Sequence, residues 1–243
     1  MKSIAKSQSQ VDVIQRLNSL LSPATELYPS KVWSFLSTPK KSHSFTQGAG
    51  IKKRNFTQTF TQQEYDDLLK IKDNLITYIL TKNKYRCCYC KRSIGKHGWS
   101  WEIEHIKNKK QYPQLTFELS NLTLACIDCN RFKNINIDNK DRSQKIIDPN
   151  QKNFDYESHI KFFQLSTAKL HLLKYTPISS EGNTTYNGLC FEKLEYQEVL
   201  KSIDEIKCDS INKIDAAIEY FNSNEENKPI ANFLLKLKSR ILK

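Results

Sequence analysis

The stretch WEIEHIKNKKQYPQLTFELSNLTLACIDCNRFK, residues 101–133, decides how this chain of 243 residues folds. It contains a Glu-His pair, the separated asparagines Asn121 and Asn130, a Cys-x-x-Cys pair and a run of basic residues. A second cysteine-rich sequence, CCYC, lies upstream at residues 87–90. Five of the seven cysteines therefore fall within residues 87–129, which marks this segment as the candidate site of the chain's chemistry.

The cysteines of this segment predict a structural zinc site. Cys87 pairs with Cys90 and Cys126 with Cys129, each with the two-residue spacing of zinc ligands. Four thiolates complete a tetrahedral site and leave no position open for water, so this zinc would stabilise the fold without activating water. Cys88 offers a competing thiolate and is assigned to packing.

Residues between the two cysteine pairs, and the residue directly after the second pair, can supply the groups that phosphodiester hydrolysis requires. His105 is the candidate general base, because the ordinary pKa of histidine is about 6.5. Glu104 and Asn130 offer carboxylate and amide oxygens to a catalytic Mg²⁺ or Mn²⁺. Asn121 is expected to fix the loop that orients His105. Glu102, on the same strand face as Glu104, is the alternative carboxylate ligand.

Local patterns place these residues on two strands and a helix. Residues 101–106 alternate in polarity and predict a strand, residues 122–125 predict a second strand, and residues 126–134 begin a helix. Successive residues of a regular strand point to opposite faces. Glu104 and His105 can therefore serve one metal only if the first strand bends or ends at His105.

This arrangement resembles the HNH endonuclease family in its cysteine-containing ββα-metal form. The resemblance rests on His105 and Asn121 between the cysteine pairs and Asn130 directly after the second pair, with Glu104 at the acidic position before the histidine. It implies a metal-dependent endonuclease whose catalytic residues are these three and whose substrate is DNA by default, with RNA left open. The chain departs from the family pattern at residues 106–108, where a proline is common.

A narrower resemblance points to a biological setting. The segments CCYC, IEHIKNKKQYPQLTFELSNLTLACIDCNRFK and IIDPN…HIKFF are similar to the PtuB-like HNH effectors of retron and Septu antiphage systems. The similarity covers residues 85–135 and extends less closely to about residue 163. It implies an antiphage effector with a partner ATPase that restrains or licenses the nuclease.

Positive charge is concentrated in the first part of the chain. Residues 151–243 hold 13 basic and 13 acidic residues, so residues 1–150 carry the whole net charge of +12. This asymmetry predicts a nucleic-acid-binding surface, the alternative being that the lysines only confer solubility. The residues expected to contact the phosphate backbone beside the site are Lys107, Lys109, Lys110, Arg131 and Lys133.

The flanking segments are predicted to be mainly helical. Residues 61–82 form a helix that begins at a capping box, Thr61 with Glu64. Residues 40–56 are predicted to be a loop, either a plain surface connection or a basic arm over a phosphate backbone. Further expectations are a short helix at 156–163, a loop at 181–188, a long helix at 195–221 and a final helix at 228–243.

Other residues receive structural assignments. His43, His97, His159 and His171 are expected on loops or the surface, Trp99, Trp101 and Tyr112 in the core, and Cys190 and Cys208 as buried thiols. No run of about 18 apolar residues predicts a membrane helix. The opening MKSIAKSQSQ lacks the apolar stretch of a secretory signal, so a cytoplasmic protein is expected.

The sequence thus predicts an α+β protein with a zinc-stapled ββα-metal core embedded in mainly helical terminal segments. The expected divisions are a basic segment at 1–60, a helix at 61–82, the nuclease core at 83–137 and a helical, partner-docking region at 138–243. The competing hypotheses are a non-catalytic zinc-ribbon module that binds nucleic acid, and an assembly subunit that acts with the ATPase.

Overall fold

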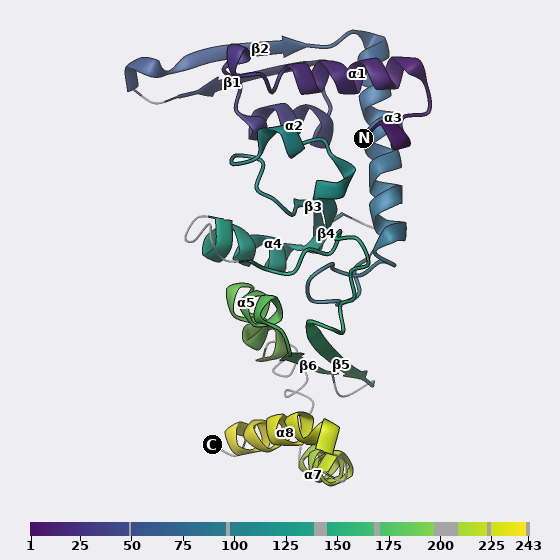
Figure 1. Ribbon diagram of the computed structural model, residues 1–243, viewed down its shortest axis with the longest axis vertical. Helices are drawn as coiled ribbons and strands as arrows, with labels where there is room; N and C mark the ends of the chain where they lie inside the picture. The colour runs from purple at the N-terminus through teal and green to yellow at the C-terminus, as the bar shows by residue number, and fades with distance from the viewer. Residues whose placement is uncertain are drawn as a thin grey trace. The chain divides into compact units, whose positions relative to one another are not determined.

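The computed structural model describes residues 1–48, 50–95, 98–138, 145–167, 171–196, 209–222 and 225–241. The chain divides into two compact units, the first comprising residues 1–130 and 148–152 and the second residues 131–147 and 153–243. Both contain helices and a two-stranded antiparallel sheet or sheets, which confirms the α+β class (Figure 1). No helix in the described ranges has the length and apolar character needed to cross a membrane.

The first unit is built around a long helix. α3 (Gln62–Lys82) begins at the predicted capping box: Thr61 Oγ1 accepts a hydrogen bond from the Glu64 amide at 3.2 Å, and the Glu64 carboxylate accepts one from the Thr61 amide at 2.8 Å. α1 (Gln8–Ser19) and α2 (Pro29–Ser37) pack against α3. The first backbone amides of a helix have no partner within the helix. The side chains of Thr61 and Glu64 provide partners, so the capping box fixes where α3 starts.

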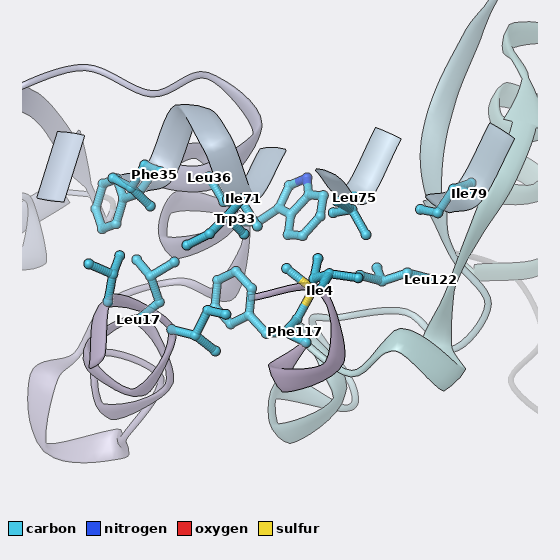
Figure 2. Close-up of a cluster of buried hydrophobic side chains, with 14 of the residues drawn as sticks. Ile4, Leu17, Trp33, Phe35, Leu36, Ile71, Leu75, Ile79, Phe117 and Leu122 are labelled. Carbon is cyan, nitrogen blue, oxygen red and sulfur yellow. The ribbon is translucent and has the colours of Figure 1, made fainter. Parts of the chain in front are cut away.

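The core of this unit joins the N-terminal helices to the predicted nuclease segment (Figure 2). It gathers buried side chains of α1, α2 and α3 together with residues that follow the candidate base, among them Leu17, Trp33, Phe35, Leu75, Phe117 and Leu122. The basic N-terminal segment is therefore not an appendage, because its apolar residues complete the core on which the site rests.

Residues 40–56 do not form the predicted loop. They belong to an antiparallel hairpin of β1 (Ser42–Gln47) and β2 (Arg54–Thr59), with Phe45 opposite Phe56. Alternate residues of the hairpin are more buried, a two-residue period that distinguishes a strand from a loop. The prediction was wrong because polar and basic residues outnumber apolar residues here, whereas pairing between the two strands satisfies their backbone groups.

The ββα segment has the predicted elements. β3 (Trp101–His105) pairs antiparallel with β4 (Leu122–Cys126), His105 lying opposite Leu122, and α4 (Ile127–Lys133) follows β4 directly. β3 ends at His105, which meets one of the two conditions stated for Glu104 and His105 to serve one metal.

The second unit corrects two predictions. Residues 156–163, predicted to be a short helix, lead into β5 (Ile160–Ser166), which pairs antiparallel with β6 (His171–Pro177). Residues 181–188, predicted to be a loop, belong to α5 (Ser180–Gly188). Gly182 lowers helix propensity, but a Cβ there would lie 2.0 Å from the carbonyl oxygen of His159, so only glycine fits.

Two C-terminal helices of the second unit enclose a small apolar core. α7 (Asp209–Asn222) packs on α8 (Lys228–Ile241), with Ile214, Ile218, Leu234 and Leu237 buried between them. The helix predicted at 228–243 is therefore present over most of its length. Of the helix predicted at 195–221, residues 195–196 and 209–221 are helical, and the middle lies outside the described residues, as do His97 and Cys208.

Candidate functional site

The four predicted zinc ligands come together. The sulfur atoms of Cys87, Cys90, Cys126 and Cys129 all lie within 4.8 Å of one another, and those of Cys90 and Cys126 are 3.7 Å apart. A tetrahedral site with zinc–sulfur bonds of about 2.3 Å requires sulfur atoms about 3.8 Å apart, so the donor set fits zinc. Cys88 is buried but outside this cluster, in keeping with its assignment to packing.

Backbone and side-chain donors surround the cluster. The amides of Cys126 and Cys129 donate to the sulfurs of Cys87 and Cys126, at 3.3 and 3.5 Å. Arg92 donates to the Cys126 sulfur at 3.5 Å and forms an ion pair with Asp128. Burial alone would lower the pKa of Arg92, but Cys90 and Cys126 outweigh it and raise the pKa above its ordinary range. A guanidinium beside the thiolates offsets the negative charge that four of them bring to one zinc.

His105 lies at the end of β3 and is buried, with 5% of its surface exposed. Its ring meets the indole of Trp33 edge to face, the centroids being 4.5 Å apart. Its Nε2 is 3.1 Å from the carbonyl oxygen of Thr116. Because a carbonyl oxygen only accepts hydrogen bonds, Nε2 carries the hydrogen, and Nδ1 is the basic nitrogen of the neutral ring.

Asn121 holds the loop that follows His105. Its Oδ1 accepts a hydrogen bond from the Lys107 amide at 2.7 Å, and its Nδ2 donates to the carbonyl oxygens of Lys107 at 3.0 Å and Leu115 at 3.1 Å. The Asn121 backbone carbonyl also accepts from the Ile106 amide at 3.0 Å. These four bonds connect both ends of the loop to the start of β4.

The two carboxylates considered as metal ligands share one face of β3. Glu102 and Glu104 are two residues apart on the strand, so their side chains project from the same face. The Asn130 side-chain amide, on α4, donates a hydrogen bond to the Glu102 carboxylate. Glu104 and Asn130 are buried, with 4% and 9% exposed, whereas Glu102 is exposed. Asn130 therefore contacts the alternative ligand, Glu102, whose side chain lies on the same strand face as that of Glu104.

The predicted phosphate-binding residues differ in their exposure. Lys107, Lys110 and Arg131 are exposed, and Lys109 is half-buried. The Lys107 ammonium lies 5.8 Å from the ring centroid of Tyr112. Lys133 is buried, with 1% exposed, and this burial argues against its part in binding a phosphate backbone.

Several structural assignments need correction. Trp99 is 87% exposed and Tyr112 is 41% exposed, so neither belongs to the core, whereas Trp101 is buried as predicted. Cys190 is half-buried rather than buried. His43 is neither on a loop nor fully on the surface: it lies in β1, and its ring is 4.8 Å from that of Phe35.

Two residues at the site were missed from the sequence. Trp33 precedes His105 by more than seventy positions, and no local pattern connects the two. Arg92 could have been found from its position two residues after Cys90, where a cation can reach the thiolates. Both contacts arise from tertiary packing within the first unit.

One comparison with known proteins identifies a family for this region. Residues 87–134 match the sequence model of the family described as HNH endonuclease. The match begins at Cys87, the first cysteine of the cluster, and includes His105, Asn121, Asn130 and both carboxylates of β3. No curated protein and no solved structure matches the chain.

Proposed function

We propose that this protein is a metal-dependent endonuclease that hydrolyses phosphodiester bonds of nucleic acid, with DNA as its substrate. The domain match at residues 87–134 supports activity on nucleic acid. The observation that carries the proposal is the Asn121 clamp: one buried amide binds both the N–H and the carbonyl of Lys107, two residues after the candidate base. An asparagine side chain can both accept from and donate to the Lys107 backbone, and it thereby holds the segment that follows His105.

In the proposed reaction His105 takes the proton from the attacking water at Nδ1. The carbonyl of Thr116 fixes the tautomer and the indole of Trp33 fixes the plane of the ring, so that the basic nitrogen keeps one direction. Asn121 acts as a positioning residue, because its hydrogen bonds hold the loop between His105 and Thr116.

Glu104 and Asn130 would hold the catalytic Mg²⁺ or Mn²⁺. A buried carboxylate and an amide oxygen are ligands that such a hard cation accepts, together with water and substrate oxygens. When bound, the cation would neutralise charge on the phosphate oxygens. Glu102 would orient the Asn130 amide through their hydrogen bond.

The basic residues beside the site would bind the phosphate backbone. Lys107, Lys110 and Arg131 are exposed, and we propose that they bind phosphates and so position the substrate without selecting its sequence. The zinc cluster would hold β4 and α4 together and thereby fix Asn130.

The resemblance to PtuB-like effectors supports a narrower proposal. The protein would act in the cytoplasm as an antiphage effector, and an ATPase partner would restrain or license it. Residues 138–243 would provide the docking region. Their basic and acidic residues balance, whereas the segment that contains the proposed nuclease is basic. A chain that is inert alone and cuts once the ATPase is added would support this arrangement.

The proposal is tested with purified protein on supercoiled plasmid DNA and on total RNA. Each substrate is incubated with Mg²⁺, with Mn²⁺ and with EDTA, and with the His105→Ala variant in parallel. His171→Ala in the second unit is the matched histidine control. We expect metal-dependent cutting of DNA that His105→Ala abolishes while zinc content, measured by mass spectrometry, stays at one per chain.

Two results would contradict the proposal. Cutting that survives in His105→Ala would remove the residue from catalysis. Nucleic-acid binding without cutting, with and without the partner ATPase, would favour the zinc-ribbon binding module instead.

A further inference from the structure

The β1–β2 hairpin has one face made entirely of small polar residues. Cross-strand partners of an antiparallel pair share a face, and three consecutive pairs on alternate positions are Ser42 with Thr59, Ser44 with Thr57 and Thr46 with Asn55. All six side chains are exposed. Hydrogen bonds stiffen this face, because Ser44 and Thr57 hydroxyls are 3.1 Å apart and Thr46 donates to Asn55 at 2.8 Å. The hairpin thus presents an exposed row of donors and acceptors without a formal charge.

Basic residues border this face at both ends. Lys40 and Lys41 precede β1, and Lys52, Lys53 and Arg54 lie between the strands or at the start of β2. Residues 27–63 contain six basic residues and no acidic residue. In the described part of the chain Arg54 pairs with Glu26, while the four lysines have no carboxylate within ion-pair distance. Their charge therefore remains available to a polyanion.

The other face anchors the hairpin to the helix that contacts the candidate base. Phe35 of α2 packs on His43 at 4.8 Å and on Phe45 at 6.1 Å between ring centroids. Trp33, two residues earlier in α2, packs on His105 at 4.5 Å. One short helix therefore holds the hairpin on one side and the candidate base on another.

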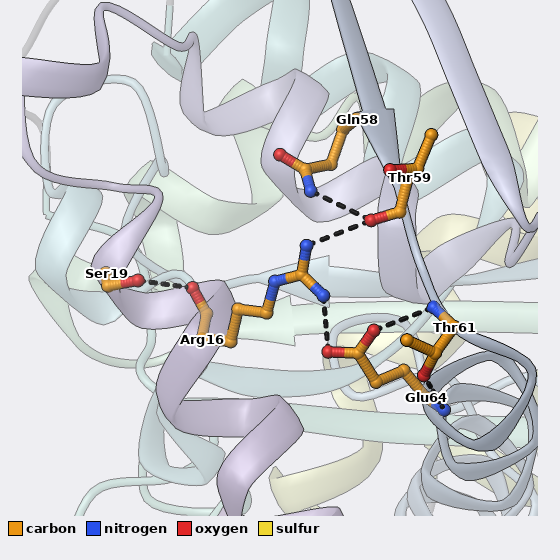
Figure 3. A network of polar contacts seen from close by, with 6 residues as sticks. All are labelled: Arg16, Ser19, Gln58, Thr59, Thr61 and Glu64. Carbon is orange, nitrogen blue, oxygen red and sulfur yellow. Dashed lines mark hydrogen bonds and ion pairs between the residues drawn. The ribbon is translucent and has the colours of Figure 1, made fainter.

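A polar network fixes the base of the hairpin a second time (Figure 3). Arg16 of α1 donates to the carbonyl oxygen of Thr59 at 2.9 Å and forms an ion pair with Glu64, the capping residue of α3. The Arg16 side chain thus joins α1, the end of β2 and the start of α3. The tip extends beyond α1 and α2, as Figure 1 shows. The hairpin is an arm with a fixed root and an exposed, basic tip.

We propose that the β1–β2 hairpin binds duplex DNA in the major groove, its polar face toward the phosphate backbone that borders the groove and its lysines pairing with phosphates. This inference rests on the proposed nuclease function, since it assigns the substrate duplex to an arm fixed relative to His105. Ser, Thr and Asn side chains are common donors to phosphate oxygens. Six residues of strand span about 20 Å, roughly half a turn of B-form DNA.

The side chains of the face favour a duplex over a single strand. Single strands are bound through aromatic side chains on which bases stack, but Phe45 and Phe56 lie on the opposite, anchored face. A two-stranded ribbon fits the major groove of B-form DNA. The major groove of an RNA helix is too narrow for side chains to enter, so DNA is the duplex that the ribbon fits.

The test measures binding of a fluorescent DNA duplex by the full chain carrying His105→Ala, so that no substrate is cut. The tip variant is Lys52→Gln with Lys53→Gln, and its charge-matched control is Lys6→Gln with Lys70→Gln, both exposed lysines of the same unit. The face variant is Thr46→Glu with Thr57→Glu. Its control is Thr77→Glu with Thr81→Glu, exposed threonines of α3.

We expect the tip variant to weaken duplex binding about tenfold and to lower the slope of log affinity against log salt by about 2. The face variant is expected to weaken binding at least as much, and both controls far less. Circular dichroism and zinc content check that every variant is folded. Equal binding by the hairpin variants and their controls overturns the inference. So does the absence of duplex binding by the parent chain, or tighter binding of single-stranded DNA or of RNA.

Cleavage by the chain with His105 intact is measured separately. Cleavage that is unaffected by the hairpin variants would support the nuclease proposal and refute the DNA-binding role of the hairpin. Hairpin-dependent duplex binding without any cleavage would support the DNA-binding role of the hairpin and refute the nuclease proposal.

Discussion

The indole of Trp33 meets the imidazole of His105 edge to face, with centroids 4.5 Å apart and planes inclined by 83°. Trp33 also packs on Phe117, at 5.8 Å, and belongs to the core of the first unit. The candidate base is therefore held by a residue of the N-terminal helices, outside the segment 87–134 that matches the HNH family. The orientation of His105 depends on this contact as well as on Thr116.

Trp33→Phe tests the contact without emptying the core. We expect zinc content and DNA binding to be unchanged and the cleavage rate to fall about tenfold, because a small misorientation of a catalytic group lowers the rate by such amounts. Trp33→Ala should in addition lower the free energy of unfolding by about 3–5 kcal/mol. Phe60→Leu is the control, since Phe60 is buried in the same core but packs on Phe35 and His43. If Trp33→Phe cleaved DNA at the wild-type rate, the indole would not be what orients His105.

Asn121 is predicted to be irreplaceable even by aspartate. Asn121→Ala removes the partner of three backbone groups and should lower the free energy of unfolding by about 3 kcal/mol. Asn121→Asp keeps the acceptor for the Lys107 amide but turns an oxygen toward the carbonyls of Lys107 and Leu115. We expect both variants to lose cleavage at least about tenfold, measured beside urea unfolding curves. Asn74→Ala, which loses one bond to the Ile4 carbonyl, is the control; equal effects would refute the clamp.

The two carboxylates of β3 should differ in a way that metal titration can measure. Glu104→Gln removes a proposed ligand and is expected to abolish cleavage at every Mn²⁺ concentration. Glu102→Gln weakens the orientation of Asn130 and should raise the Mn²⁺ concentration for half-maximal cleavage by about 10–100-fold, with recovery at high Mn²⁺. The reverse pattern would identify Glu102 as the ligand.

Zinc binding should require four of the five cysteines in residues 87–129 and should not require the fifth, Cys88. Cys129→Ser is expected to lose zinc and to lower the melting temperature steeply, because structural zinc contributes about 10–16 kcal/mol of apparent binding energy in small zinc domains. Cys88→Ala removes an adjacent buried thiol that lies outside the cluster and should retain one zinc per chain. Zinc content by mass spectrometry and thermal unfolding are the measurements. Loss of zinc in Cys88→Ala would overturn the ligand assignment.

Glu195 should make the second unit less stable as pH rises. Its carboxylate is 2% exposed and accepts hydrogen bonds from the Tyr175 amide at 2.8 Å and from Lys174 at 3.2 Å. Burial raises the pKa of Glu195 above its ordinary 4.5 and outweighs the lowering effect of Lys174. The native state therefore binds the proton more tightly than the unfolded state does. The stabilisation is complete below pH 4.5 and is lost as pH rises through the raised pKa.

Glu195→Gln should remove this dependence. Urea unfolding followed by circular dichroism between pH 4.5 and 8 is the measurement, and Glu157→Gln, an exposed carboxylate of the same unit, is the control. A wild-type unfolding free energy that rises across this range, relative to Glu195→Gln, would contradict the assignment.

The sequence by itself determined the elements whose signals are local. The capping box of Thr61 and Glu64 set the start of α3, and the alternation of residues 101–106 set β3. The cysteine spacings identified the four residues that the structure brings together. Each of these signals works over a few residues, because caps, strand faces and metal-binding pairs are formed by near neighbours.

Only the tertiary structure decided the elements that need a distant partner. β1 and β2 are polar segments that become strands by pairing with each other, and β5 is a strand because β6 satisfies its backbone groups. Strand propensity depends on such neighbours more than helix propensity does, so residues 156–163 were predicted to be a helix although β5 begins at Ile160. The contacts of Trp33 with His105 and of Glu102 with Asn130 arise in the same way. Packing across the core, and not spacing along the chain, brings those side chains together.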